Sequence, residues 1–126
     1  MKRILCPWRR KYVALTPEEW VRQNFLHRLV DDYGYPANLI GVEVALQGKR
    51  ADAIVYSQDL QPQVLIEFKA ETVPLTQKTL DQAAVYNQQL GVPYLILHNG
   101  PQTIIAQVTD NEIAFLPEIP KYGHHS

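Results

Sequence analysis

The chain has 126 residues, of which 46% are hydrophobic and 20% are charged, and its formal net charge at pH 7 is −1. This length suits one domain with a substantial buried core and is too short for two. The near-neutral charge argues against a protein that coats nucleic acid, because such a protein needs a strongly basic surface. An enzyme that meets nucleic acid through one local patch remains compatible with this composition.

The single cysteine and the lack of long apolar runs indicate a cytoplasmic protein. Cys6 is the only cysteine, which excludes an internal disulfide and a cysteine-based zinc site and fits a reducing compartment. No apolar run approaches the ~20 residues of a membrane helix. The first residues also lack the apolar core of a signal peptide. We therefore expect a cytoplasmic protein with no membrane partner.

The sequence divides into three parts. Residues 1–15 form a basic N-terminal segment, which is either a local patch for nucleic acid or a solvated tail. Residues 16–120 form one domain, because they contain neither an internal repeat nor a low-complexity linker. Residues 121–126 are predicted to be a disordered tail, and no chemistry is assigned to His124 and His125. The cations of the N-terminal segment are Lys2, Arg3, Arg9, Arg10 and Lys11.

Residues 16–34 predict the first helix of the domain. Thr16 is a suitable N-cap residue, and Gly34 is a suitable residue to end the helix. Two glutamates follow the cap, where their charge suits the positive end of the helix dipole. The apolar stripe begins three residues after Glu18, so we expect Glu18 to face inward more than Glu19 does.

The remainder of the domain predicts a sheet and a second helix. Three short strands in succession are followed by a helix that Thr76 and Gly91 cap, and then by a fully apolar strand typical of a sheet centre. The last strand is expected at the sheet edge because Pro117 interrupts it. Both helices need an apolar surface to cover, so the prediction is an α/β fold with a mixed central sheet flanked by helices, in the core order αβββαβ. The predicted strands are residues 39–46, 51–56, 64–70, 92–100, 103–109 and 112–119, and the second helix is residues 76–91.

A charged triplet interrupts the third strand, where Glu67 and Lys69 flank Phe68. Side chains alternate along a strand, so Glu67 and Lys69 point to one face and Phe68 points to the other. Asp52 stands at the head of the preceding strand, and antiparallel pairing can bring it beside Glu67. Two facing carboxylates repel each other, so this pair needs a cation.

The pair suits a hard divalent ion. Magnesium takes oxygen ligands and keeps several waters, which an open site with two carboxylates allows. Lys69 beside the ion can supply positive charge to a scissile phosphate or orient an attacking water. This combination suits metal-assisted phosphodiester hydrolysis. The alternative is a surface ion-pair patch formed by Asp52, Glu67 and Lys69 on a solvent-facing strand.

Two further features add polar groups to this constellation. Gln82 and Tyr86 lie four residues apart in the second helix, on a face offset from its apolar stripe. They are either aimed together at a ligand or part of a solvated helix flank. Glu18 adds a carboxylate from the first helix, and the alternative role for it is compensation of the helix dipole.

Taken in order, these residues resemble the PD-(D/E)xK nuclease superfamily. The specific resemblance is to the N-terminal domain of the R subunit of type I restriction enzymes, in its small stand-alone bacterial form. The matching stretches cover the chain from about Arg9 to Tyr122, although the turn at residues 47–50 is shorter than in many relatives. These stretches are "RRKYVALTPEEWVRQNFLHRLV", "GYPANLIGVEVAL", "KRADAIVY", "VLIEFKA", "TLDQAAVYNQQLGVPYLILHNG" and "FLPEIPKY".

The resemblance implies a restriction-endonuclease-like fold and a Mg²⁺-dependent endodeoxyribonuclease, with Mn²⁺ as a substitute ion. The implied metal ligands are Asp52, Glu67 and the backbone carbonyl of Phe68, with Glu18 assisting directly or through water. Lys69 is implied to position the attacking water and to stabilise charge on the phosphate.

The resemblance also assigns DNA-binding residues. Gln82 and Tyr86 match the Gln-x-x-x-Tyr motif of this branch and are implied to orient Lys69 or to contact the DNA backbone. Arg22 matches an arginine that follows the first-helix glutamate, and Arg50 matches an arginine just before the metal aspartate. Both are assigned to DNA binding.

The chain contains no glycine-rich Lys-Ser/Thr phosphate-binding motif, so we expect that it does not translocate DNA. A separate helicase or restriction-system partner is therefore expected, or a homodimer, because cutting both strands needs two sites. RNA is a second substrate open to the same chemistry. One alternative function is a catalytically silent module that binds DNA or a partner protein. Another alternative function is that of an interaction protein that binds neither metal nor nucleic acid.

Overall fold

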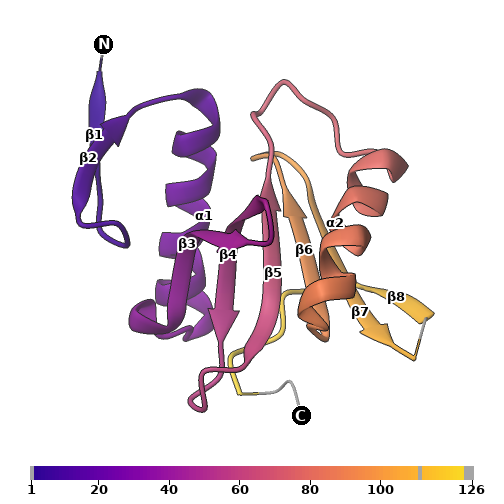
Figure 1. The fold of residues 1–126 in the computed structure, drawn as a ribbon. Helices are drawn as coiled ribbons and strands as arrows, with labels where there is room; N and C mark the ends of the chain where they lie inside the picture. Colours follow the sequence, from indigo (N-terminus) through magenta and orange to yellow (C-terminus); the bar gives the residue numbers. More distant parts are fainter. Residues whose placement is uncertain (1, 111, 124–126) are drawn as a thin grey trace.

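The computed structural model describes residues 2–110 and 112–123, which fold into a six-stranded sheet, a two-stranded sheet and two α-helices (Figure 1). His124, His125 and the rest of the predicted tail beyond residue 123 lie outside the described residues. The elements are β1 (Arg3–Cys6), β2 (Lys11–Ala14), α1 (Pro17–Tyr33), η1 (Ala37–Leu39), β3 (Ile40–Leu46), β4 (Lys49–Tyr56), β5 (Pro62–Phe68), α2 (Gln77–Leu90), β6 (Tyr94–His98), β7 (Thr103–Thr109) and β8 (Glu112–Leu116).

The six-stranded sheet has the order β3-β4-β5-β6-β7-β8. Neighbouring strands are antiparallel except β5 and β6, which are parallel and are joined through α2. A parallel pair needs such a crossover because a short turn cannot return the chain to the same end of the sheet. All residues of β6 are buried, as the sequence predicts for a central strand, and β8 forms the predicted edge.

Both helices begin and end at the predicted residues. The Thr16 hydroxyl accepts a hydrogen bond from the Glu19 N–H at 3.0 Å, and Gly34 ends α1 with a left-handed φ of 75°. Thr76 caps α2 through a capping box, and Gly91 ends it in the left-handed conformation. Local cap chemistry therefore fixes the ends of both helices.

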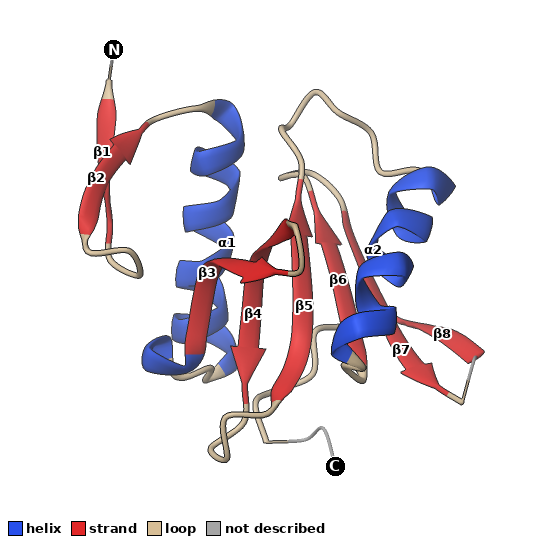
Figure 2. Cartoon of the chain, viewed as in Figure 1, coloured by secondary structure: helices blue, strands red, loops and turns tan. Residues whose placement is uncertain are grey.

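The two helices cover opposite faces of the sheet (Figure 2). Phe25 of α1 packs in one core cluster with Ile66, whereas Leu80 of α2 packs in the other with Leu65. The adjacent strand residues Leu65 and Ile66 thus enter different cores, as strand alternation requires. The predicted mixed sheet flanked by helices is confirmed. No helix among the described residues is both long and apolar enough to cross a membrane.

The N-terminal segment forms a folded hairpin, a possibility that neither interpretation of its basic sequence included. Strands β1 and β2 pair in antiparallel fashion, and Cys6 at the end of β1 is only 1% exposed. The hairpin docks on α1, because the Trp8 ring lies 5.1 Å from the ring of His27, and Arg9 ion-pairs with Glu19. Residues 3–14 are therefore part of the folded unit.

Candidate active site

The structure brings the two predicted carboxylates Asp52 and Glu67 together. Ala53 of β4 pairs with Ile66 of β5, so Asp52 and Glu67 occupy the next positions along the two strands. The Asp52 Oδ2 atom accepts a hydrogen bond from the Phe68 N–H at 2.8 Å, which orients the carboxylate toward the end of β5. Both carboxylates are half-buried.

The electrostatics of this pair disfavour the ionised form of Glu67. Burial raises the pKa of Glu67 to about 9, and the charge of Asp52 adds to the rise, while Lys69 opposes it. The buried Oε1 atom of Glu67 has no hydrogen-bond partner among the described residues. Buried polar atoms normally have partners, so this oxygen is available to accept a hydrogen bond or to coordinate a ligand.

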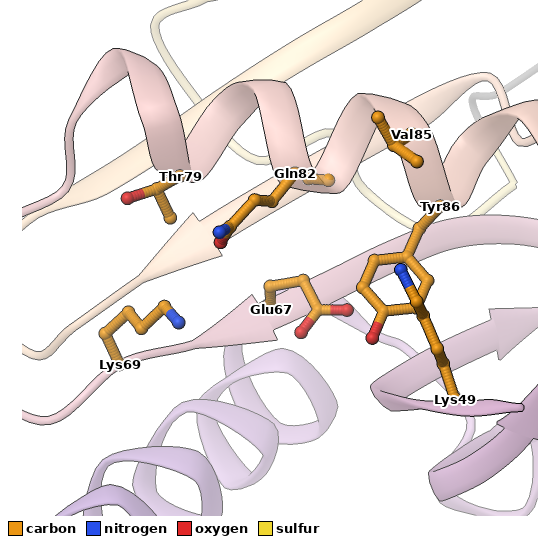
Figure 3. A pocket seen from close by; sticks show the side chains of 8 residues that line it. Lys49, Glu67, Lys69, Thr79, Gln82, Val85 and Tyr86 are labelled. Carbon is orange, nitrogen blue, oxygen red and sulfur yellow. The ribbon is translucent and has the colours of Figure 1, made fainter.

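Glu67 and Lys69 open into a pocket of about 460 Å³ beneath α2, here called the α2-side pocket. Figure 3 shows Gln82 pointing from α2 toward Glu67 and Lys69, and Tyr86 directing its ring toward Glu67. The predicted faces are therefore correct: Glu67 and Lys69 share this pocket, whereas the buried Phe68 side chain lies in the α1-side core. The lining residues are Lys49, Glu67, Lys69, Thr79, Gln82, Ala83, Val85 and Tyr86.

Tyr86 is suited to act as a hydrogen-bond donor in this pocket. Burial raises its pKa, and the carboxylates of Glu67 and Asp52 raise it further, so the hydroxyl keeps its proton. In the structure this hydroxyl donates a long hydrogen bond of 3.4 Å to the Arg50 carbonyl. Lys49 places its ammonium 5.3 Å from the centre of the Tyr86 ring. The sequence interpretation missed Lys49, although its place at the start of the strand that carries Asp52 was a usable signal.

Glu18 approaches Asp52 from a second pocket, of about 560 Å³, here called the α1-side pocket. Glu18 is exposed, and partial burial together with the charge of Asp52 raises its pKa, which Lys69 and Arg22 oppose. Asp52 lines this pocket while it also interacts with Glu67 of the α2-side pocket. The predicted constellation is thus gathered around Asp52, which lies between the two pockets.

The expected orientation of the two consecutive glutamates is wrong. Glu19 is the buried one, at 3% exposure, and Glu18 is exposed. Glu19 accepts hydrogen bonds from Arg9, Arg22 and Gln23, which hold its pKa below the ordinary value although burial opposes this. The helix pattern did not predict this because Arg9 comes from the N-terminal hairpin, which the sequence interpretation left without structure.

The two arginines assigned to DNA have different surroundings. Arg22 is 5% exposed and ion-pairs with Glu19 and, at 3.6 Å, with Glu43. The Arg50 side chain is 72% exposed and lies 3.7 Å from Glu43. Only Arg50 of these two therefore presents its guanidinium to solvent. Glu43, which the sequence interpretation missed, has a left-handed φ of 53°, a costly conformation for a residue with a β-carbon.

The described residues contain no group of three or more His, Cys, Asp and Glu side chains that could hold a metal ion. Glu18 therefore does not form a three-carboxylate ligand set with Asp52 and Glu67. An ion at this pair would take the two carboxylates as its side-chain ligands and complete its shell with backbone oxygen and water.

The fold and the site define a small mixed α/β domain with a carboxylate pair and a lysine at the end of a central strand. The family model for the type I restriction enzyme R protein N terminus (HSDR_N) matches residues 17–120. The chain belongs to this family.

The structure is similar to a fragment described as the HsdR subunit of a type I restriction enzyme from Vibrio vulnificus YJ016. The TM-score is 0.60 and the sequence identity is 22%, so this likeness concerns the fold. The match covers 86% of this chain and 24% of that chain. None of the curated proteins compared matches the sequence.

Proposed function

We propose that the chain is a metal-dependent deoxyribonuclease of the PD-(D/E)xK type, with a restriction-endonuclease-like fold, that acts in a restriction system. The observation that carries the proposal is the half-buried Asp52–Glu67 pair, with an unpartnered Glu67 oxygen and Lys69 beside it. Membership of the type I restriction enzyme R protein N-terminal family supports the restriction-system role.

The residues at the pair fit a magnesium ion, with Mn²⁺ as a substitute. All the donors are oxygens, and a divalent cation would relieve the repulsion between Asp52 and Glu67 and give the Glu67 Oε1 atom a partner. The N–H and the C=O of a strand residue point to the same side, and the Phe68 N–H faces Asp52. The Phe68 carbonyl oxygen therefore faces Asp52 too, and we assign it as the third ligand. Glu18 would act through water. When bound, the ion would polarise the scissile phosphate and lower the pKa of an attacking water.

The side chains around the pair have separate tasks in this mechanism. Lys69 would hold the attacking water and stabilise the charge that develops on the phosphate. Gln82 would orient the Lys69 ammonium, since both side chains line the α2-side pocket. The protonated Tyr86 hydroxyl would donate a hydrogen bond to a DNA phosphate, and the exposed Arg50 would contact the backbone nearby.

The test is nicking of a supercoiled plasmid with Mg²⁺ or Mn²⁺, beside an EDTA control. We expect metal-dependent nicking by the wild-type chain and a loss of at least about 100-fold in Lys69→Ala, because such groups contribute about that much to the rate. Lys78→Ala is the matched control, because Lys78 is exposed on α2 and does not line the α2-side pocket. Wild-type cutting by Lys69→Ala would refute the mechanism.

The lack of a third side-chain ligand among the described residues favours a second candidate, a catalytically silent module that binds DNA or a partner protein. This function predicts DNA binding that EDTA leaves unchanged and that Asp52→Ala does not weaken, together with no nicking.

In the nuclease proposal, cutting of both strands would require two copies of the site, supplied by a homodimer or with a separate restriction-system partner.

A further inference from the structure

The N-terminal hairpin carries a concentrated positive charge. Residues 2–17 contain five lysines and arginines and no aspartate or glutamate. Arg9 is neutralised by ion pairs with Glu19 and Glu43. The other four cations are exposed, and they are Lys2, Arg3, Arg10 and Lys11.

The hairpin is held in a fixed position, so these charges have a defined place in the molecule. Cys6 is buried, and Arg9 forms an ion pair with Glu19 of α1. The Leu15 N–H donates a hydrogen bond of 3.0 Å to the Lys2 carbonyl, which closes the base of the hairpin. Charges presented by an anchored element lose less conformational freedom on binding than charges on a loose tail.

The hairpin forms one wall of the pocket that contains Asp52. Arg9, Val13 and Ala14 of the hairpin line the α1-side pocket together with Glu18 and Asp52. Figure 1 shows the hairpin on the α1 side of the molecule, so that it and α2 flank strands β4 and β5 from opposite sides. A polyanion that reaches Asp52 from the α1 side therefore passes the hairpin.

The site itself needs such a neighbour. Glu18 and Asp52 place carboxylates at the α1-side pocket, where their negative charge repels a nucleic-acid phosphate. Lys49 and Arg50 supply positive charge at the start of β4. Among the described residues that line the α1-side pocket, the only cations are Arg9 and Arg22, and both are ion-paired with Glu19. The exposed cations of the hairpin lie outside this lining, on the element that forms one wall of the pocket.

We propose that the hairpin is a clamp for the sugar–phosphate backbone of DNA, which holds the strand across the α1-side pocket next to Asp52. This proposal rests on the proposed function and assigns a binding surface to it. Lysine and arginine contacts to phosphates fix the register of a nucleic acid without reading its bases, so the clamp binds all sequences alike. Tyr12, whose side chain is 61% exposed beside Arg3, adds an aromatic surface on which an unpaired base can stack.

The experiment measures binding of the full chain to a fluorescent 30-base-pair DNA duplex in EDTA, where no cutting occurs, over a series of salt concentrations. The hairpin variant is Arg3→Ala/Lys11→Ala. The matched control is Arg28→Ala/Lys121→Ala, which removes the same charge from exposed positions outside the hairpin. We expect weaker binding by the hairpin variant and a salt slope reduced by about two, because each lost phosphate contact removes about one. The control should bind as the wild type does.

Equal binding by the two double variants would overturn the clamp, and so would a wild-type chain that does not bind the duplex at low salt. Melting temperatures of both variants identify any loss of folding. Plasmid nicking is read separately. Metal-dependent nicking with equal binding by the two variants refutes the clamp alone, whereas hairpin-dependent binding with no effect of Lys69→Ala refutes the nuclease alone.

Discussion

Two consecutive glutamates at the start of α1 have opposite surroundings. Glu19 is buried between Arg9 and Arg22, where it holds the hairpin against the helix. Glu18 is exposed and lies near enough to Asp52 for the two charges to interact. Glu19 therefore stabilises the fold, and Glu18 is available to the site.

This contrast predicts opposite effects of two neighbouring substitutions. Glu19→Ala should lower the free energy of unfolding by about 3–5 kcal/mol, because it leaves the buried Arg22 and the half-buried Arg9 with only their longer ion pairs to Glu43. Glu18→Ala should change stability little and reduce plasmid nicking. Urea denaturation and nicking assays on both variants measure the two effects. Similar losses of stability in the two variants would contradict these assignments.

Glu67 should make the stability of the metal-free protein depend on pH. Its pKa is about 9 in the folded state and near 4.5 in the unfolded chain, so folding favours the protonated carboxyl. The stabilisation is complete below about pH 4.5 and is lost as the pH rises toward 9. A pKa difference of one corresponds to about 1.4 kcal/mol of stability, so the effect is large enough to measure.

The measurement is urea unfolding in EDTA at pH 6 and pH 8.5 for the wild type and for Glu67→Gln. The difference in stability between the two proteins should shift in favour of the variant at the higher pH, because glutamine does not ionise. A difference that does not change with pH would show that the Glu67 carboxyl titrates normally.

At the scale of elements, the turn from α2 into β6 depends on one side chain. Asn87 accepts a hydrogen bond from the Val92 N–H at 2.7 Å and donates one to the Val92 carbonyl at 3.1 Å. Both bonds are buried. Since α2 carries Gln82 and Tyr86, this turn also fixes one wall of the α2-side pocket.

Asn87→Ala should therefore lower the free energy of unfolding by about 1–3 kcal/mol, the cost of leaving buried backbone groups without partners. Gln88→Ala, at the next and exposed position, should leave stability nearly unchanged. Thermal melts of both variants test this expectation. An Asn87→Ala protein as stable as the wild type would mean that water replaces the amide.

The sequence predicted the elements whose signals are local. Thr16, Gly34, Thr76 and Gly91 mark the helix ends through cap chemistry that involves only nearby residues. The hairpin was not predicted because its strands have only four residues each, and because Arg9 finds its partners outside the hairpin, at Glu19 and Glu43. Its stability depends on contacts with α1 that no local pattern encodes.

At the scale of the whole molecule, the candidate site draws on α1, β4, β5 and α2. Strand alternation was enough to predict that Glu67 and Lys69 share a face and that Asp52 lies near them. The division into two pockets, with Asp52 between them, depends on how both helices and the hairpin pack. This three-dimensional arrangement could not be predicted from the spacing of the residues.

Magnesium should stabilise the whole domain if Asp52 and Glu67 bind it. A ligand that binds only the folded state adds about 2.7 kcal/mol at 100 times its dissociation constant. Thermal melts with and without Mg²⁺ should therefore show a rise in Tm for the wild type and for Asp59→Ala, an exposed aspartate in the β4–β5 turn. Asp52→Ala should abolish the rise. No rise in the wild type would favour an interaction protein that binds no metal.

The arrangement of the sheet also bears on how the chain folds. Strands β3, β4 and β5 are joined by short turns, whereas the parallel pairing of β5 with β6 must wait for α2 to cross over. Contacts between residues that are close in sequence form with less loss of chain entropy, so we expect the β4–β5 hairpin to form early. Asp52 and Glu67 then already repel each other in the folding transition state. Glu67→Gln should therefore speed refolding in EDTA more than it slows unfolding. Stopped-flow kinetics that show the change only in the unfolding rate would place the approach of the two carboxylates late in folding.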